Sequence, residues 1–463
     1  MDRTSSVIVD YTAASRDAQL GRDASRAVRR TLVDVLACAV GGLDSRPAQV
    51  ARALAAGTAS DPGATAFGLS RPTSIELAVF ANTVMTRYLD WNDTYFTRRG
   101  GGGHPSDIVP TALAVGEAVH ASGPAVMSAI VCGYEIIGAL ASAVWVRERG
   151  WDQGINVVAA TAMIAGCLLE LDAEQLDHAL ALAVTPNVPV RQTRIGHLSM
   201  WKGCATAGAA RNGVFAALLA KNGMTGPPEP YEGRSGIWEQ VTGPFDLRIP
   251  VTSGDLVIQD VQTKLRPAEF NAQGPIELAL QIRGSLDLSS VTAIELQTYW
   301  LTYHEIGMDD AKWDPRTRET ADHSLPWLLA VALTDGKVDL DSCSPARLAD
   351  PSVRALMAKV RITENPGFTA RFPREFPNRL VVHTADGREV ARELSHPPGH
   401  RQSPVDDGQL NEKLDFVLRE RSDQDVKLAL QARDGLWNID QIEDVATLLQ
   451  PLSRLEANGG AGV

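Results

Sequence analysis

Side chains that can transfer protons and bind anions are concentrated between residues 87 and 107, in the string RYLDWNDTYFTRRGGGGHPSD. Asp90 and Thr94 lie four residues apart at the end of an apolar-periodic segment, so we expect both to project from one face of a helix. A flexible Gly-rich loop should follow, and His104 then opens the next helix. An acid, a hydroxyl and an imidazole would converge beside a helix N-terminus, which favours anions. This pattern predicts acid–base chemistry on an anion, although a single loop histidine can equally be structural.

Several common signatures of other chemistries are missing from the sequence. There is no G-x-x-x-x-G-K-[ST] string, and the run Gly100–Gly103 lacks the preceding strand and the spacing of a dinucleotide-binding loop. The pair His304 and Glu305 has no second histidine four residues on, which argues against a zinc protease. G-x-S-x-G is absent, and the scattered cysteines cannot supply a clustered thiolate set. We therefore expect no nucleotide, metal or organic cofactor.

Length and composition are those of an ordinary globular protein. The 463 residues are 44% apolar and 22% charged, and the chain is long enough to bury a sizeable core. The formal net charge is −12 and no run of five or more basic residues occurs, so nucleic acid and acidic membrane surfaces are poor partners. Five scattered cysteines predict reduced thiols, and the first residues do not resemble a secretory signal. We expect a cytoplasmic protein.

Successive helices rich in Ala, Leu and Val are predicted from about residue 24 to residue 220. Small residues let such helices approach closely, and several are apolar nearly all round, which indicates an all-α bundle with buried central members. Residues 125–146 are long enough to span a bilayer, but Glu135 lies at their centre. We interpret this segment as a buried helix.

The pattern changes between about residues 250 and 395, where β-branched runs alternate with turn dipeptides. Residues 291–306 are predicted to form one strand, and two later strands should be joined by an Asp-Gly hairpin turn at 386–387. Residues 321–336 have the spacing of a helix. These features are typical of a smaller α+β domain.

The chain becomes helical again after residue 404, and we expect this terminal helix pair to pack back on the N-terminal bundle. The sequence therefore predicts a mainly α protein. Residues 1–255 and 400–463 should form a large all-helical domain from both chain ends, with residues 256–399 as the smaller α+β domain.

Four further strings accompany the segment 87–107 and cover most of the chain up to residue 336. They are RERGWDQGINVVAATAMIAG (147–166), SMWKGCATAGAARNGVFAALLAKNGMTGP (199–227), KLRPAEFNAQGPIELAL (264–280) and DPRTRETADHSLPWLLAVALTDG (314–336). In this order they resemble the MmgE/PrpD family, which includes 2-methylcitrate dehydratase, cis-aconitate decarboxylase and iminodisuccinate epimerase. The resemblance implies a large all-helical domain built from both chain ends, a smaller α+β lid domain and a homodimer.

The resemblance also implies an active site at four positions of this chain. Asp90, Thr94 and His104 fall on active-site positions of the family, and so does Lys264, which begins the K-x-x-P-A string. The chemistry common to the family is proton handling at a carbon flanked by carboxylates. His104 is the principal candidate for proton transfer, because an imidazole exchanges protons near neutral pH.

Three further residues are candidates for binding substrate carboxylates. Lys202 and Arg211 lie on the helix that faces the cleft in the family, where cations would compensate a di- or tricarboxylate. Each can equally be a surface cation whose aliphatic stem covers apolar residues. His323 belongs to the string ADHSLPW, and a structural hydrogen bond at a helix start is an equal alternative for it. Asp322 or Ser324 is predicted to cap that helix, and a cap is the role we expect for Asp322.

Two positions depart from the family pattern. The family often has a histidine where this chain has Gln153, and another where it has Asn271. Both amides can hydrogen-bond a substrate carboxylate, but neither can transfer protons. One or both proton-transfer roles of the family dehydratases and decarboxylases are therefore lost or relocated in this chain.

Together these implications predict a cofactor-independent lyase acting on a small di- or tricarboxylate, a hydro-lyase similar to 2-methylcitrate dehydratase. A base would remove a proton α to a carboxylate, cations would stabilise the enediolate-like charge, and an acid would assist the departure of hydroxide. A decarboxylase of cis-aconitate type and an epimerase of a small dicarboxylate are alternatives within the family. The amides at positions 153 and 271 keep another alternative open, a non-catalytic binding or assembly protein on the same fold.

Overall fold

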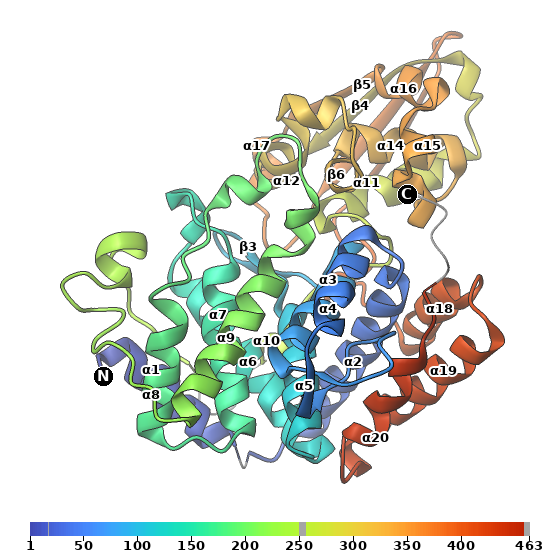
Figure 1. Cartoon of the computed structure of the whole chain (residues 1–463). Coiled ribbons are helices and arrows are strands. Elements are labelled where there is room, and N and C mark those ends of the chain that lie inside the picture. The colour runs from blue at the N-terminus through green and yellow to red at the C-terminus, as the bar shows by residue number, and fades with distance from the viewer. Residues whose placement is uncertain (17, 250–255, 458–463) are drawn as a thin grey trace.

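Helices dominate the computed structural model, which describes residues 1–16, 18–249 and 256–457 (Figure 1). The prediction of a mainly α protein is confirmed. The helices of the first half are α1 (Arg3–Ser15), α2 (Arg22–Gly42), α3 (Arg46–Ala56), α4 (Ile75–Tyr88), α5 (Val109–Ala118), α6 (Gly123–Ala143), α7 (Gly154–Leu168), α8 (Ala173–Val184) and α9 (Ala205–Lys221). The first half is not all-α as expected, because it also contains three short strands, β1 (Ala59–Ala64), β2 (Tyr95–Thr97) and β3 (Gly100–Gly103).

Close packing of these helices depends on glycine at two crossings. A Cβ atom added to Gly213 of α9 would lie 2.1 Å from Thr161 Oγ1 of α7. One added to Gly42 of α2 would lie 2.2 Å from the carbonyl oxygen of Met85 in α4. Neither position has room for a side chain, because protein interiors are close-packed. The small-residue bias of the sequence therefore reflects helices whose backbones approach closely.

Helix α6 is the one described helix that is long and apolar enough to cross a membrane. In the structure, 83% of its apolar window is buried inside the protein, which is the behaviour of a core helix. Its central Glu135 accepts a hydrogen bond from the backbone N–H of Val257 at 2.6 Å, so the buried carboxyl has a partner. The predicted buried helix is confirmed.

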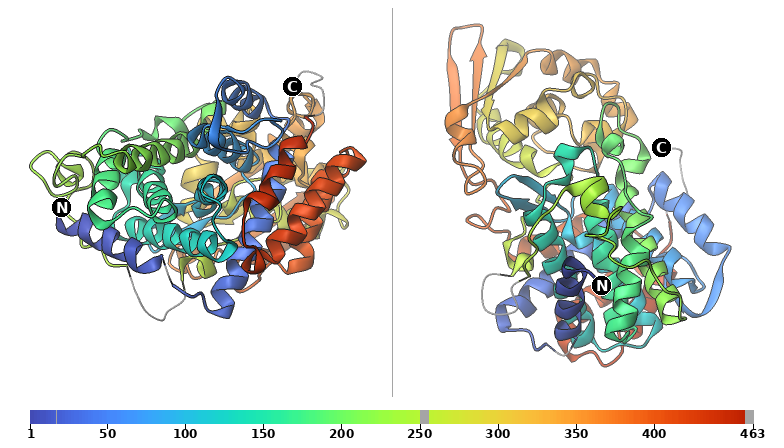
Figure 2. Two further views of the ribbon diagram at one scale, coloured as in Figure 1. Left: turned by 60° about the horizontal axis from the view of Figure 1, so that its bottom comes forward. Right: turned by 90° about the vertical axis from the view of Figure 1, so that its left-hand side faces the viewer.

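The C-terminal helices pack back on the N-terminal bundle, as the sequence predicted: α18 and α19 contact α2, and α20 contacts α5 (Figure 1 and Figure 2). A buried ion pair joins α18 to α2, because Lys413 Nζ lies 2.7 Å from Asp34 Oδ1. The same ammonium donates to the carbonyl of Trp91 at 2.7 Å and lies 4.7 Å from the centre of its ring. Trp91 directly follows Asp90, so this helix holds the segment that carries a candidate site residue. The three helices are α18 (Asp407–Leu418), α19 (Asp423–Trp437) and α20 (Ala446–Leu449).

A four-stranded sheet and the helices around it form a second hydrophobic core, at the opposite end of the molecule in Figure 1. The strand order is β5-β4-β6-β7, parallel between β4 and β5 and antiparallel at the other two pairings. The predicted hairpin joins β6 to β7, and Gly387 supplies the positive φ of +82° that its turn requires. The strands are β4 (Val291–Thr298), β5 (Val360–Glu364), β6 (Asn378–Thr384) and β7 (Glu389–Leu394). The helices between α9 and α18 are α10 (Val257–Asp260), α11 (Gln273–Arg283), α12 (Trp300–Thr302), α13 (Arg318–Ala321), α14 (Leu325–Asp335), α15 (Pro345–Leu348), α16 (Pro351–Met357) and α17 (Pro366–Thr369).

The single strand predicted over residues 291–306 is wrong in its second half. Strand β4 ends at Thr298, and the chain continues as α12 and a π-helical turn over Tyr303–Gly307. Tyr299 and Leu301 are buried in an aromatic cluster with Phe96, which belongs to β2 of the helical half. Packing against these rings overrides the β propensity of the aromatic run.

Besides the aromatic cluster, the described residues form two large hydrophobic clusters. The first draws on residues 8–258 and 414–455, and the second on residues 268–382. The predicted boundary between residues 255 and 256 adjoins the stretch 250–255, which lies outside the described residues. The division into two domains stays a prediction.

We expect Lys413→Met to lower the free energy of unfolding by about 3–5 kcal/mol, because Asp34 would remain as a buried, unpaired charge. Urea denaturation of both proteins measures the difference. Lys427→Met is the matched control, since Lys427 is exposed on the neighbouring helix α19. A loss below about 1 kcal/mol in Lys413→Met would mean that the ion pair does not hold α18 in place.

Candidate active site

Asp90 and Thr94 do not share a helix face, contrary to the sequence prediction. Helix α4 ends at Tyr88, and Asp90 adopts the left-handed region with φ +50°. Positive φ is uncommon outside glycine, although Asp tolerates it better than most residues. The turn is fixed by its contacts: the Asp90 N–H donates to the carbonyl of Arg87 at 3.1 Å, and its own carbonyl accepts from Lys264 Nζ at 2.8 Å. This backbone places the Asp90 carboxylate inside the protein.

The Asp90 carboxylate is buried among three cations. Arg87 Nη1 lies 3.1 Å from Oδ1, Lys202 Nζ lies 2.7 Å from Oδ2, and Lys264 Nζ forms an ion pair with Oδ1. Burial alone would raise the pKa of Asp90, but the charges of Arg87, Lys202 and Lys264 hold it well below its usual value. Asp90 is therefore ionised throughout the physiological pH range.

A second buried carboxylate belongs to the same ion-pair cluster. Lys202 Nζ lies 3.1 Å from both carboxylate oxygens of Asp322, and His323 Nδ1 lies 2.6 Å from Asp322 Oδ1. Of the two predicted helix caps, Ser324 supplies the cap, since its Oγ accepts from the Trp327 N–H at 3.3 Å, and the role expected for Asp322 is wrong. Burial and the nearby Lys202 lower the pKa of His323 to about 4, so its ring is neutral near pH 7.

The four consecutive glycines form a buried strand, not the flexible loop that the sequence predicted. Strand β3 pairs antiparallel with β2, and Gly100 and Gly103 have φ values of +156° and +111°. A Cβ atom on Gly101 would lie 3.3 Å from Arg147 Nη1, and one on Gly103 would lie 3.2 Å from Gln153 Oε1. The glycines therefore let two polar side chains approach the backbone of this strand.

His104 follows this strand and has a defined tautomer. Its Nδ1 lies 2.7 Å from the carbonyl oxygen of Asp93 and 3.3 Å from Thr94 Oγ1. A carbonyl only accepts, so the proton sits on Nδ1 and Nε2 is free to accept another. Burial, together with the charges of Arg87 and Lys264, lowers the pKa of His104 well below its usual value. The ring is therefore a neutral base at pH 7.

Asp93 is fixed in turn by three hydrogen bonds. Its carboxylate accepts from the Ser106 N–H at 3.0 Å, from Ser106 Oγ at 2.6 Å and from the Tyr134 hydroxyl at 2.8 Å. Burial raises the pKa of Asp93 to about 6. These bonds hold the carbonyl that orients the His104 ring.

A cavity of about 50 Å³ lies beside this network, between the two hydrophobic cores. Five of the residues predicted from the sequence line it: Thr94, His104, Gln153, Asn271 and His323. The complete lining is Arg87, Thr94, Phe96, Gly101, His104, Arg147, Gln153, Arg194, Glu269, Asn271, Leu301, Glu305, Ile306, Lys312 and His323. Asp90, Lys202 and Lys264 form the ion-pair cluster behind this wall, so the structure brings eight of the nine predicted residues together.

Arg211 is the predicted residue that the structure does not bring to the cavity. Its side chain is exposed on α9, while Lys202 is buried. Lys202 lies in the 3-10 turn Met200–Gly203 and Arg211 lies on α9, so the two residues do not share the helix on which the resemblance placed both. This placement agrees with the alternative prediction that Arg211 is a surface cation.

Sequence reasoning missed several charged residues of the lining. Arg147 donates to Gln153 Oε1 at 2.9 Å, and Arg194 pairs with the buried Asp152 at 2.6 Å. Lys312 and Glu269 also line the cavity. Arg147 belongs to a family-like string, so its charge was visible, but no spacing rule connected it with residue 104. Lys312 lies just before such a string and carried no signal.

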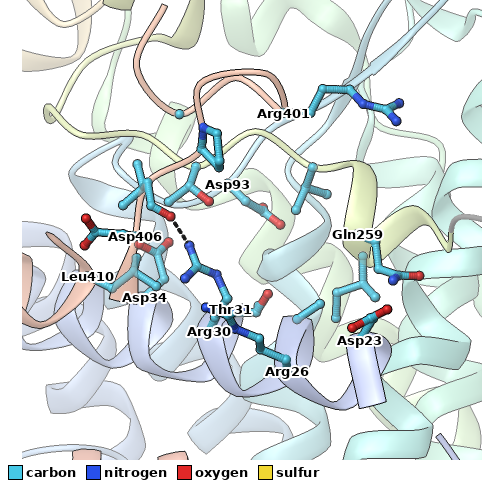
Figure 3. A pocket seen from close by; sticks show the side chains of 17 residues that line it. Asp23, Arg26, Arg30, Thr31, Asp34, Asp93, Gln259, Arg401, Asp406 and Leu410 are labelled. Atoms are coloured by element: carbon cyan, nitrogen blue, oxygen red, sulfur yellow. Dashed lines mark hydrogen bonds between the residues drawn. The ribbon is translucent and has the colours of Figure 1, made fainter. Parts of the chain in front are cut away.

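The structure also holds a larger cavity of about 410 Å³ (Figure 3). Asp93 lines this larger cavity, whereas the Asp93 carbonyl binds His104 of the smaller one. The remaining wall comes from α2, from residues 258–263 and from residues 399–410.

The arginines of the larger cavity already have acidic partners. Arg26 and Arg30 both pair with Asp407, and Arg401 pairs with Asp260 at 2.8 Å. An anionic ligand would have to compete with these carboxylates for each guanidinium. We therefore place the candidate active site in the smaller cavity.

No clustered set of metal ligands is visible in the sequence, but the fold brings three candidate ligands together. Ligand atoms of Asp90, Asp322 and His323 lie within 4.8 Å of one another. Both carboxylates are, however, already paired with ammonium groups of Lys202 and Lys264. A metal ion would have to displace these buried cations, so the residues do not fit a resident metal.

Comparison with known proteins agrees with this geometry. Family models match the chain as MmgE/PrpD N-terminal domain over residues 6–250 and as MmgE/PrpD C-terminal domain over residues 267–438. These matches span most of the sequence, and the chain belongs to the MmgE/PrpD family.

Similar curated proteins are enzymes. The 2-methylcitrate dehydratase of Cupriavidus necator is 28% identical over 421 residues, which cover 85% of each chain. The 2-methylcitrate dehydratase of Salmonella typhi is 26% identical over 81% of this chain and 82% of the relative. The cis-aconitate decarboxylase of Mus musculus is 23% identical over 73% of this chain and 70% of the relative. These similarities support an enzymatic function of the dehydratase type.

We expect Asp90→Asn to lower the free energy of unfolding by about 3–5 kcal/mol near neutral pH, because three buried cations lose their shared counter-ion. The pKa of Asp90 is lower in the folded than in the unfolded protein. Its contribution is therefore complete above the unfolded-state value of about 3.9 and is lost as the pH falls below it.

Urea denaturation of both proteins between about pH 7 and pH 3 measures this difference. The difference in the free energy of unfolding should become smaller below about pH 4. The control is Asp314→Asn, which removes one partner of an exposed surface ion pair and should differ little from the wild type at any pH. A gap that stays constant down to pH 3 would contradict the assignment of a depressed pKa to Asp90.

Proposed function

We propose that the protein is a hydro-lyase that removes water from a small tricarboxylate such as 2-methylcitrate. One observation carries the proposal: the cavity holds buried hydrogen-bond donors that have no acceptor in the part of the chain that the structure describes. Lys312 is 2% exposed, and its Nζ has no hydrogen-bond or ion-pair partner among the described residues. The Gln153 Nε2 group is buried and lacks an acceptor among the same residues. A ligand rich in carboxylate oxygens would satisfy both donors.

The proposed reaction uses the defined tautomer of His104. Its Nε2 would take a proton from the carbon α to a substrate carboxylate, while the Asp93 carbonyl keeps the other ring proton in place. The charge that develops on that carboxylate would be stabilised by the lining cations Arg87, Arg147 and Lys312. We also propose two finer features that the resemblance implies, a homodimer and a lid domain over residues 256–399.

Decarboxylation is the second candidate, because one of the similar proteins is a cis-aconitate decarboxylase. The assay that separates the two uses 2-methylcitrate, citrate, cis-aconitate and an iminodisuccinate analogue in D2O, with product formation and solvent deuterium incorporation followed together. We expect an unsaturated tricarboxylate from 2-methylcitrate or citrate, and no loss of rate after exhaustive chelation. Turnover of cis-aconitate with release of CO2 would favour the decarboxylase. No turnover of any compound would favour a non-catalytic protein.

Lys312→Met should lower kcat/KM about 10- to 100-fold, mainly through KM, because a charge-assisted hydrogen bond contributes about 1.5–3 kcal/mol. The variant should be no less stable than the wild type, since it removes a buried charge without a partner. Steady-state kinetics and thermal melting check the two parts. Lys337→Met is the control, because Lys337 is exposed. A destabilised variant with normal KM would make Lys312 a structural residue.

A further inference from the structure

The proposed dehydration needs a proton donor as well as a base. Hydroxide is a poor leaving group, and a positioned acid typically accelerates such a step about 10²- to 10⁴-fold. His104 supplies the base, but Gln153 and Asn271 cannot titrate. Both nitrogens of the neutral His323 ring face buried carboxylates, Nδ1 toward Asp322 Oδ1 at 2.6 Å and Nε2 toward Asp90 Oδ2 at 3.3 Å, so its single ring proton is already bound to a carboxylate. Among the remaining described residues of the lining, Glu269 has a carboxyl group that forms no ion pair.

Glu269 lines the cavity and is fixed by one neighbour. Its Oε2 accepts from the Asn271 N–H at 2.7 Å, and its Oε1 accepts from Asn271 Nδ2 at 2.8 Å. Asn271 Oδ1 in turn accepts from the Tyr299 hydroxyl at 2.5 Å. Asn271, predicted as a substrate-binding residue, therefore also positions the Glu269 carboxyl.

A purely structural role does not account for this arrangement. Glu269 occupies the cap position of the short 3-10 helix Phe270–Ala272, where one accepted hydrogen bond suffices and shorter side chains are preferred. No Lys, Arg or His nitrogen of the described residues lies within 4.0 Å of its carboxylate. The other acidic residue of the lining, Glu305, is instead paired with Arg191 at 2.8 Å. Glu269 thus retains a lone pair for a proton and has no ion-pair partner.

We infer that Glu269 is the general acid, which donates its proton to the departing hydroxyl group of the substrate. This inference rests on the proposed function. In the step, the C–H bond α to a carboxylate breaks and its proton moves to His104 Nε2. The electron pair forms the C=C bond, the C–O bond breaks, and the hydroxyl oxygen takes the proton of Glu269 and leaves as water. Glu269 ends as a carboxylate and His104 as an imidazolium, and exchange with solvent restores both.

The charges around the two groups agree with these roles. Burial raises the pKa of Glu269 to about 7; Lys264 lowers this pKa, whereas Asp90 and Glu305 raise it. The environment of His104 shifts its pKa in the opposite direction, below its usual value. The two shifts reverse the usual order, in which a carboxylic acid loses its proton at lower pH than an imidazolium does, so Glu269 can hold a proton while His104 is a neutral base.

The test compares Glu269→Gln with the wild type on 2-methylcitrate and on the analogue in which fluorine replaces the leaving hydroxyl. Fluoride leaves without prior protonation. We expect the variant to lose about 10²- to 10⁴-fold in kcat on the hydroxy substrate and less than about tenfold on the fluoro analogue. The alkaline limb of the wild-type kcat/KM profile, near pH 7, should be absent from the variant.

The matched control is Glu277→Gln, which removes a carboxylate of α11 that pairs with Arg266 at 2.8 Å outside the cavity. It should keep the wild-type rate on both substrates. Glu269→Gln should melt no lower than the wild type at about pH 8, where the native carboxylate is ionised in a buried site. An infrared difference spectrum between about pH 6 and pH 9 should show a titrating carboxylic acid in the wild type that is missing from the variant.

The outcomes separate the two proposals. If the wild type dehydrates neither 2-methylcitrate nor citrate, the proposed function fails, and the role of Glu269 in it fails as well. If the wild type is active but Glu269→Gln retains its rate within about threefold, the assignment of Glu269 alone is overturned. Equal losses on the hydroxy and fluoro substrates would overturn it too, because a structural defect does not depend on the leaving group.

Discussion

The Asp90 carboxylate is the charge on which the site depends. Three cations from separate parts of the chain meet on it: Arg87 from α4, Lys202 from the turn before α9, and Lys264 from the chain before α11. Without this carboxylate, three buried positive charges would repel one another in a region of low dielectric. These three partners come from distant parts of the sequence. The left-handed backbone of Asp90 places its carboxylate, and this position determines how those parts of the chain meet beside the cavity.

The ion-pair cluster also sets the chemistry of the cavity. Burial, together with the positive charges of Arg87 and Lys264, keeps His104 neutral, so the base of the site carries no negative charge that would repel an anionic ligand. Among the cations of the lining, Arg194 is paired with Asp152 at 2.6 Å, whereas Lys312 has no ion-pair partner among the described residues. Buried ammonium groups are therefore divided into those that the protein satisfies and those left to a ligand.

Much of the fold and part of the site could be predicted from the sequence. Hydrophobic periodicity located the helices, and family-like strings located Asp90, His104 and Lys264 before any geometry was known. Periodicity could not reveal the strand of four glycines, because glycine has no side chain to show an alternating pattern. It also could not reveal Lys312 or Glu269, since the role of a single charged residue depends on which groups lie beside it in the folded protein.

The ion pair between Lys413 and Asp34 joins residues that are 379 positions apart. A growing chain emerges from the ribosome N-terminus first, at about 5–20 residues per second. For most of synthesis, Lys413 has therefore not yet been made, and neither Asp34 nor the Trp91 carbonyl has the ammonium group that binds it in the folded protein. The helical bundle is completed only after the sheet between its two parts has been made, so its folding is governed by contacts of very high sequence separation, which are slow to form.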